Sequence, residues 1–387
     1  LEGNGELLAT GTIDNVSLAP RQTGKFKTSF PAIQVKPGVE YFLNFYASLK
    51  NEDGLLKAGT KLADAQVSLP FYQPFVAEVQ SSPVIADDAA SLLTFTAGNL
   101  SVGFDKETGA LISYKEGSTE LIKEALRPNF WRPVTDNDMG NGMNKTLRPW
   151  RDAGRQAKLL SMKQKALGKE VYEVVSHYKL PVGESDFIVT YHFSGKGYLD
   201  VNCTFIPGND TLPLLPRMGV SITLNRQFSQ MEWLGRGPHE NYIDRNTSSY
   251  VGLYKGSVAD QYFPYDRPQE NGNKTEVRWM SLTDTAGQGL MVVGQPYVST
   301  SAYLFPTEDL DEPGLRKSQR HLSDIQFKDM VTWNIDLKQM GVGGDTSWGA
   351  YPHQPYLIPA ERMSFSFRFC PAKQNGVSGN RQYLNFK

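Results

Sequence analysis

The stretch YLDVNCTF at residues 198–205 alternates strictly between apolar side chains and polar or amphipathic ones. In a β-strand, successive side chains point to opposite faces of the sheet, so a period of two predicts a strand with one buried face. The side chains on the predicted buried face are Leu199, Val201, Cys203 and Phe205.

The same alternation recurs along most of the chain. It is clearest at residues 41–49, 187–193, 332–337 and 365–369. Patterns with helical spacing are short and are confined to 120–126, 146–160 and 257–262. The sequence therefore predicts an all-β protein. The unbroken strand pattern from residue 85 to residue 387 predicts one large sandwich of two sheets.

The charge of the chain is balanced, because 40 Lys and Arg residues stand against 41 Asp and Glu residues, for a net charge of -1. A nucleic-acid-binding or polybasic membrane-surface protein would show a basic excess, so we expect neither partner. No apolar run approaches the ~20 residues of a membrane-spanning helix. The two cysteines, Cys203 and Cys370, are too few for a disulfide framework. They leave the location open between cytoplasm and periplasm.

Residues 1–72 are predicted to form a small immunoglobulin-like β-sandwich. In VKPGVEY (35–41) a Pro-Gly turn precedes Tyr41, as in the tyrosine corner of such sandwiches, where the phenol bonds upstream backbone. An ordinary strand tyrosine is the alternative. Such domains have about seven strands and we count about four or five, so we expect an N-terminally truncated sandwich. Residues 73–84 are predicted to be a linker to a second domain over 85–387.

Two loops rich in Gly and Pro carry candidate acid–base residues, LGRGPHENY at 234–242 and PYDRPQENGNKTEVRW at 264–279. A glycosidase needs two carboxylates, which Glu240 and Glu270 could supply. A mutarotase needs an acid and a base, which His239 and Glu240 could supply. The alternative is structural, since loop carboxylates often accept backbone N–H bonds or pair with arginines.

The stretch FWRPVTDND at 130–138 contains Asp136 and Asp138. Carboxylate and amide oxygens suit a hard cation such as Ca²⁺ or Mg²⁺. The stretch lacks the further ligands of a complete calcium loop, and a hydrogen-bonded turn accounts for the same residues. We therefore assign no metal ligands in this chain.

The stretch MGVGGDTSW at 340–348 places Trp348 on a glycine-rich loop. An indole face there is suited to stack on the C–H face of a sugar, with Asp345 or Ser347 reaching hydroxyl groups. A tryptophan folded back on its own sandwich is the alternative. The loop is not a phosphate-binding loop, because no helix is predicted after it.

Taken together and in order, the stretches at 130–138, 234–242, 264–279 and 332–348 resemble the C-terminal part of family two glycoside hydrolases of the β-galactosidase type. The resemblance covers residues ~85 to 387 as the small-chain domain, which has a galactose-mutarotase-like supersandwich fold. It covers residues ~5 to 70, more weakly, as the immunoglobulin-like domain before it.

The resemblance implies that the two catalytic glutamates lie outside this chain. In the family they stand on a (β/α)₈ barrel of about 250 residues, and this chain is too short to contain one as well. Glu240 and Glu270 do not match them, so no catalytic residue is assigned and the chain alone is expected to be inactive. A divalent cation and a homo-oligomeric state are open for the parent enzyme. No cofactor is expected for this chain.

The resemblance also implies a carbohydrate-binding role. The tryptophan that Trp348 matches contacts the sugar or aglycone at the mouth of the barrel, and a loop that matches residues 115–120, with Gly117 and Ser118, approaches the same place. We therefore expect a non-catalytic part of an enzyme that hydrolyses terminal β-D-galactosides. The alternative is an independent mutarotase-like isomerase or a carbohydrate-binding module.

Overall fold

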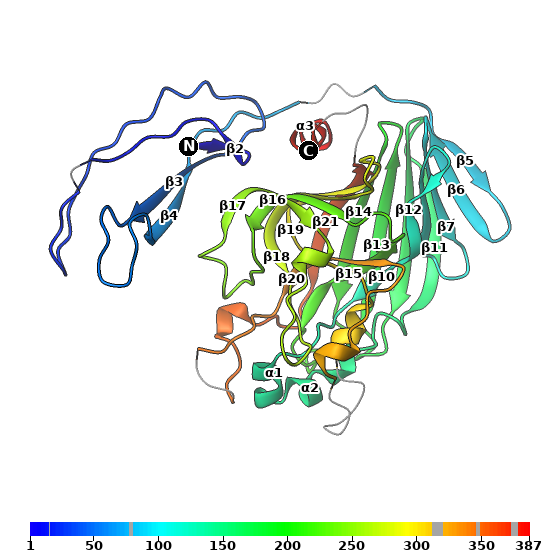
Figure 1. Cartoon of the computed structure of the whole chain (residues 1–387). Helices are drawn as coiled ribbons and strands as arrows, with labels where there is room; N and C mark the ends of the chain where they lie inside the picture. The colour runs from blue at the N-terminus through cyan, green and yellow to red at the C-terminus, as the bar shows by residue number, and fades with distance from the viewer. Residues whose placement is uncertain (15, 77–79, 312–319, 346–348, 373–377) are drawn as a thin grey trace. The chain divides into compact units, whose positions relative to one another are not determined.

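In the computed structural model the chain divides into two compact units, Leu1–Ala77 and Glu78–Lys387 (Figure 1). The structure describes all residues except 15, 77–79, 312–319, 346–348 and 373–377. The boundary between the units falls inside the segment 73–84, and each unit is described by itself.

The first unit contains one antiparallel sheet in the order β2-β1-β3-β4. Its strands are β1 (Glu2–Gly3), β2 (Glu6–Leu7), β3 (Tyr41–Ser48) and β4 (Lys61–Leu69). The predicted tyrosine corner is confirmed: Tyr41 is 2% exposed, its Oη accepts the N–H of Lys36 at 2.8 Å and donates to the carbonyl of Gln34 at 3.4 Å. The phenol therefore fixes the backbone just upstream of β3.

The predicted alternation of strand β3 is only partly confirmed. Tyr41 and Phe42 are both buried although they point to opposite faces, and Phe45, on the predicted apolar face, is only half-buried. Tyr46 is 61% exposed. Because the described residues of this unit form a single sheet, the distal half of the hairpin has no second layer to pack against.

The second unit is built on a 12-stranded sheet and a five-stranded sheet. The larger sheet has the order β10-β15-β20-β19-β21-β14-β13-β12-β11, with β16 paired to β17 and β18, and β18 paired to β19. Its strands are β10 (Ile122–Asn129), β11 (Lys158–Ala166), β12 (Val171–Lys179), β13 (Asp186–Ser194), β14 (Tyr198–Ile206), β15 (Arg217–Leu224), β16 (Gln230–Gly237), β17 (Tyr250–Ser257), β18 (Lys274–Thr283), β19 (Gly289–Tyr303), β20 (Val331–Gln339) and β21 (Met363–Pro371). The smaller sheet consists of β5 (Ile85–Asp88), β6 (Leu92–Ala97), β7 (Leu100–Asp105), β8 (Leu111–Glu116) and β9 (Thr119–Glu120).

The two sheets of this unit pack face to face through aromatic side chains. Phe95 on β6 contacts Tyr172 on β12, with ring centroids 5.0 Å apart. Phe104 on β7 contacts Tyr191 on β13 at 4.9 Å. The main hydrophobic core therefore lies between the sheets, and the all-β prediction is confirmed.

Helices are short and lie between strands or at the end of the chain. They are α1 (Asp136–Asn141), α2 (Met143–Thr146), α3 (Gly379–Phe386) and the 3₁₀ segments η1 (Arg148–Trp150), η2 (Ala259–Gln261), η3 (Thr307–Leu310), η4 (Leu322–Asp324) and η5 (Gln354–Tyr356). The helix predicted at 120–126 is wrong, because most of this segment is strand β10, which pairs with β15. No helix within the described residues combines the length and the apolar character that crossing a membrane requires.

The alternation at 198–205 is confirmed, since Leu199, Val201, Cys203 and Phe205 of β14 are buried and the residues between them are half-buried. Strands β15 and β20 differ from this pattern. All eight residues of β15 are buried, and on β20 the polar Thr332, Asn334 and Asp336 are as buried as the apolar residues between them. The centre of the large sheet is therefore covered on both faces, and its second face is polar.

Candidate functional site

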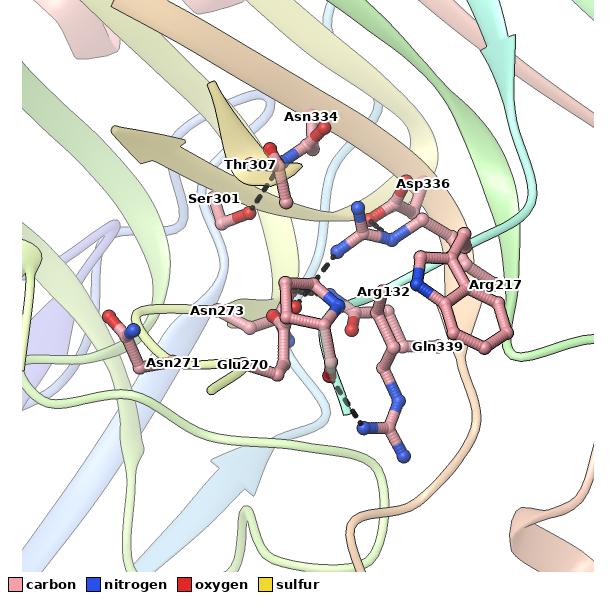
Figure 2. Close-up of polar contacts among 12 residues, drawn as sticks. Arg132, Arg217, Glu270, Asn271, Asn273, Ser301, Thr307, Asn334, Asp336 and Gln339 are labelled. Atoms are coloured by element: carbon pink, nitrogen blue, oxygen red, sulfur yellow. Dashed lines mark hydrogen bonds and ion pairs between the residues drawn. The ribbon is translucent and has the colours of Figure 1, made fainter. Parts of the chain in front are cut away.

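The buried polar face at the centre of the large sheet holds a cluster of three charges. Arg217 begins β15, Asp336 lies on β20, and Glu270 comes from the loop before β18. The Nε of Arg217 is 3.4 Å from Oδ2 of Asp336, and its Nη2 is 3.5 Å from Oε2 of Glu270. All three side chains have 0% exposure, and Figure 2 shows the guanidinium of Arg217 beside the carboxylate of Asp336.

A glycine makes room for this cluster. Gly219 of β15 pairs with Asp336 of β20, directly after a register shift in the ladder. A Cβ atom on Gly219 would lie 1.9 Å from Oδ1 of Asp336, far inside van der Waals contact. The missing side chain at this position therefore lets the carboxylate lie against the neighbouring strand.

Burial and the surrounding charges set the protonation of the two carboxylates. Burial raises the pKa of Asp336 to about 7, with Arg217 opposing the rise and Glu270 adding to it. Burial also raises the pKa of Glu270. A cluster of two acids and one base without solvent contact retains a proton to unusually high pH. Because Glu270 has no exposed side-chain surface, this conformation does not present it to a sugar.

Glu240 fixes a loop. Its Oε1 accepts the hydroxyl of Tyr265 at 2.5 Å, and its Oε2 accepts the N–H of Gly272 at 2.7 Å. The neighbouring His239 pairs through Nε2 with the hydroxyl of Ser249 at 3.0 Å. Both carboxylate oxygens of Glu240 are thus engaged between the two loops that carry the candidate acid–base residues, an arrangement that suits a structural role.

A second buried ion pair lies within residues 130–138, the stretch considered above as a metal site. Arg132 donates from Nη1 to Oδ2 of Asp138 at 2.6 Å and from Nη2 to Oδ1 at 3.1 Å. The N–H and hydroxyl of Thr135 also donate to Oδ2 of Asp138, at 2.8 and 2.9 Å, so Asp138 completes the N-terminal cap of α1. Asp138 is thereby committed to a guanidinium and a helix cap.

The exposed Asp136 has its own partner, the Nε of Arg267 at 2.7 Å. Within the described ranges, no group of three or more His, Cys, Asp or Glu side chains is arranged to hold a metal ion. In this structure Asp136 and Asp138 therefore form ion pairs with arginine side chains, Arg267 and Arg132 respectively.

The glycine-rich segment 341–345 lies against α1 and the loop that follows β16. Arg132 Nη2 donates to the carbonyl of Gly341 at 3.1 Å. The amide of Asn137 donates to the carbonyl of Val342 at 3.1 Å, and the N–H of Gly343 donates to Asp244 Oδ2 at 2.8 Å. Three consecutive residues of the segment are therefore held by side chains that are distant in sequence.

Asp345 ends this segment as an exposed side chain. Its Oδ2 is 2.5 Å from Nε2 of His353, and both side chains are 59% exposed. The hydrogen bond from His353 lowers the pKa of Asp345. Ser347 and Trp348, which the sequence assigned to the same carbohydrate site, lie outside the described residues.

Gly117 and Ser118 form the exposed turn between β8 and β9. The N–H of Gly117 donates to the carbonyl of Asn99 at 2.7 Å, and the adjacent Glu116 accepts from Gln288 at 3.5 Å. Between the residues that the structure describes, no hydrogen bond joins this turn to segment 341–345. Among the described residues, the turn with Gly117 and Ser118 is thus not hydrogen-bonded to the segment that ends in Asp345.

Sequence reasoning missed the residues that hold segment 341–345. Arg132 and Asn137 stood in a stretch interpreted for its carboxylates, and Asp244 was not singled out. Arg217 and Asp336 were missed because alternation placed Asp336 on a face expected to meet water. Two sequence features could have indicated them. One is the strongly polar side of the strand pattern TWNIDLKQM at 332–340, and the other is the charged loop RPQENGN at 267–273.

Comparison with protein families identifies the class to which this chain belongs. Residues 96–369 match the family described as β-galactosidase small chain, and residues 1–70 match β-galactosidase domain 4. The first match covers most of the chain, so the chain belongs to the β-galactosidase small-chain family.

The curated relatives are much longer proteins. A β-galactosidase of Priestia megaterium is 34% identical over 366 residues, which cover 94% of this chain and 34% of that protein. A β-galactosidase of Lactobacillus delbrueckii subsp. bulgaricus is 32% identical, over 89% of this chain and 33% of that protein. The chain thus spans about a third of the length of the curated relatives it matches.

Among solved structures, a galactose 1-epimerase from Lactobacillus acidophilus NCFM covers 76% of this chain and 99% of its own length. The sequence identity is 9% and the TM-score is 0.43.

Proposed function

We propose that this chain is a non-catalytic part of a β-galactosidase that hydrolyses terminal β-D-galactosides. In this proposal it shapes the mouth of an active site whose catalytic barrel and glutamates lie outside the 387 residues. The observation that carries the proposal is segment 341–345, whose backbone is held by the buried Arg132 and the half-buried Asp244 while Asp345 remains exposed. A fixed backbone that leads to an exposed polar side chain suits the recognition of a sugar.

The absence of catalysis in this chain is supported by the state of its candidate carboxylates. A retaining glycosidase requires two carboxyl groups about 5–5.5 Å apart that can reach the glycosidic bond. Glu270 is fully buried beside Arg217, and both oxygens of Glu240 are engaged by Tyr265 and Gly272. Neither is presented to a substrate in this conformation.

The proposed partner is a galactoside held between this chain and the catalytic barrel, with Trp348 and Asp345 on the side of this chain. An indole face contributes about 0.5–1.5 kcal/mol beyond its area when it stacks on a ligand. We propose that no cofactor is required by this chain, that neither nucleic acid nor membrane is a partner, and that the complete enzyme is a homo-oligomer.

The test compares the chain alone with the complete enzyme, using a chromogenic β-galactoside for hydrolysis and polarimetry for galactose mutarotation. We expect neither activity in the isolated chain. Hydrolysis by the chain alone would contradict the proposal, and mutarotation alone would make it a sugar isomerase.

In the complete enzyme, Trp348→Ala is expected to raise KM about twofold to tenfold, the equivalent of the lost stacking, and to change kcat less. Ser118→Ala is the comparison for the second predicted loop. An unchanged KM in a folded Trp348→Ala enzyme would remove Trp348 from the site.

A further inference from the structure

Two side chains that donate hydrogen bonds to segment 341–345 come from a part of the chain about two hundred residues away. Arg132 precedes α1 and Asn137 lies in its first turn, and each donates to a carbonyl of the segment, Gly341 and Val342 respectively. These contacts span 209 and 205 residues of sequence. The geometry of the segment therefore depends on α1.

Arg132 is itself held in one orientation. Its side chain has 0% exposure, and the forked pair with Asp138 uses both terminal nitrogens at 2.6 and 3.1 Å. The nitrogen Nη2 serves Asp138 and the carbonyl of Gly341 at the same time. A planar guanidinium can make both contacts in a fixed geometry, whereas an ammonium group cannot.

The segment is also closely packed from the other side. A Cβ atom on Gly341 would lie 2.6 Å from Oδ2 of Asp244 and 2.9 Å from Cβ of Tyr356. Asp244 Oδ2 accepts the N–H of Gly343, which has a φ of +64°. The backbone is thus enclosed between α1 and Asp244, with no space for displacement toward Asp244.

We propose that Arg132 and Asn137 are positioning residues for galactoside binding, because they hold segment 341–345 in its binding conformation before the sugar arrives. This inference rests on the proposed function. A loop that is ordered before the sugar binds lowers the entropic cost of binding, so we expect the effect on affinity. Neither residue is expected to touch the substrate.

The test uses the complete enzyme with three variants that disturb the segment in different ways. Asn137→Ala removes one donor, Arg132→Lys keeps the charge opposite Asp138 but loses the fork, and Gly341→Ala inserts a methyl group against Asp244. The matched control is Gly349→Ala, where a Cβ would meet no atom of the described residues within 4 Å. KM, kcat and the thermal midpoint are measured for each.

We expect each of the three variants to raise KM roughly threefold to tenfold while kcat stays within about twofold, the signature of lost uniform binding. Gly349→Ala should match the parent enzyme. Combining Asn137→Ala with Trp348→Ala should raise KM by less than the product of the two single effects, because both act through one segment.

The outcomes separate this inference from the proposed function. If folded Asn137→Ala and Gly341→Ala enzymes keep the parent KM while Trp348→Ala raises it, the positioning role is refuted and the proposed function stands. If Trp348→Ala also leaves KM unchanged, the positioning role is refuted and Trp348 is removed from the site, whereas the proposed function is refuted by hydrolysis or mutarotation in the isolated chain. If Arg132→Lys or Gly341→Ala does not fold, Asn137→Ala alone decides, because it removes only one partly buried amide.

Discussion

The guanidinium of Arg217 and the carboxylate of Asp336 lie 3.4 Å apart, at a place where neither side chain has any exposed surface. Charge-assisted hydrogen bonds are usually about 2.7–2.9 Å long, so this pair is coupled mainly through its charges. Glu270 faces the same guanidinium at 3.5 Å. The cluster therefore has one carboxyl group more than its arginine can neutralise, and protonation of that group is the natural compensation.

We predict that this cluster makes stability fall as pH rises toward neutrality. The folded-state pKa of Asp336 is about 7, whereas an unfolded aspartate titrates near ~3.9. Between those pH values the folded chain binds a proton that the unfolded chain releases. The protonated Asp336 therefore contributes to the free energy of unfolding in full below pH ~4, and this contribution is lost as pH rises through about 7. Asp336→Asn should flatten the dependence of the free energy of unfolding on pH between about 5 and 7.5, where each proton contributes at most about 1.4 kcal/mol per unit.

Urea unfolding at a series of pH values measures this effect. Asp210→Asn is the matched control, because Asp210 is exposed and its replacement should not change how the free energy of unfolding depends on pH. Parallel curves for the parent chain and Asp336→Asn would show that Asp336 is ionised throughout and that the prediction is wrong.

We predict that Gly219→Ala strongly destabilises the second unit. The new methyl group would lie 1.9 Å from Oδ1 of Asp336 and 2.9 Å from its Cα, so relief requires movement of strand β20. Overpacking of this kind costs typically about 1–3 kcal/mol and sometimes more. Thermal unfolding measures the loss, with Gly349→Ala as the control.

The same clash predicts a suppressor. In the Gly219→Ala background, Asp336→Ala removes the carboxylate that the methyl group meets, so the two changes together should cost less than the sum of their separate effects. Strictly additive losses would mean that Gly219 is required for a reason other than contact with Asp336.

Local periodicity was a good guide wherever one face of a strand meets the core. Strand β14 has buried Leu199, Val201, Cys203 and Phe205 with half-buried residues between them, as the alternation predicts. Periodicity states which side chains share a face, but it does not state whether the second face is covered. Periodicity therefore could not predict that Asp336 is buried, because that face is covered by loops far away in sequence.

Segment 341–345 shows the same limit at the candidate site. Its glycines and its exposed Asp345 were apparent from the sequence. The contact of Arg132 with Gly341 joins residues 209 positions apart, and nothing local to either residue predicts it. The helix expected at 120–126 was wrong for a related reason, because pairing of β10 with β15 outweighs a weak local helical pattern.

We predict that Tyr41→Phe destabilises the first unit by about 0.5–1.5 kcal/mol, the usual net value of a hydrogen bond. The lost hydroxyl accepts from the N–H of Lys36 and donates to the carbonyl of Gln34, and removing it leaves the backbone N–H of Lys36 without this acceptor. Tyr46→Phe is the matched control, because Tyr46 is 61% exposed on the same strand. Denaturant unfolding of the chain measures both, and equal midpoints for the two variants would show that the corner contributes no stability.

We predict that Glu240→Gln lowers stability and leaves the chemistry of the complete enzyme nearly unchanged. The carboxylate accepts the hydroxyl of Tyr265 at 2.5 Å and the N–H of Gly272 at 2.7 Å. A neutral amide offers only one acceptor oxygen and turns a donor toward the other partner, which should cost about 1–3 kcal/mol. Glu361→Gln, at an exposed position, is the control and should be neutral.

A spectroscopic readout makes this prediction specific to the contact. Burial raises the pKa of Tyr265 to about 12, and the hydrogen bond and charge of Glu240 add to the rise. In Glu240→Gln the phenol should therefore ionise at lower pH, which ultraviolet titration detects. A folded Glu240→Gln enzyme whose kcat falls by several orders of magnitude would place a catalytic carboxylate in this chain, because loss of a loop contact alone cannot remove a general acid or a nucleophile.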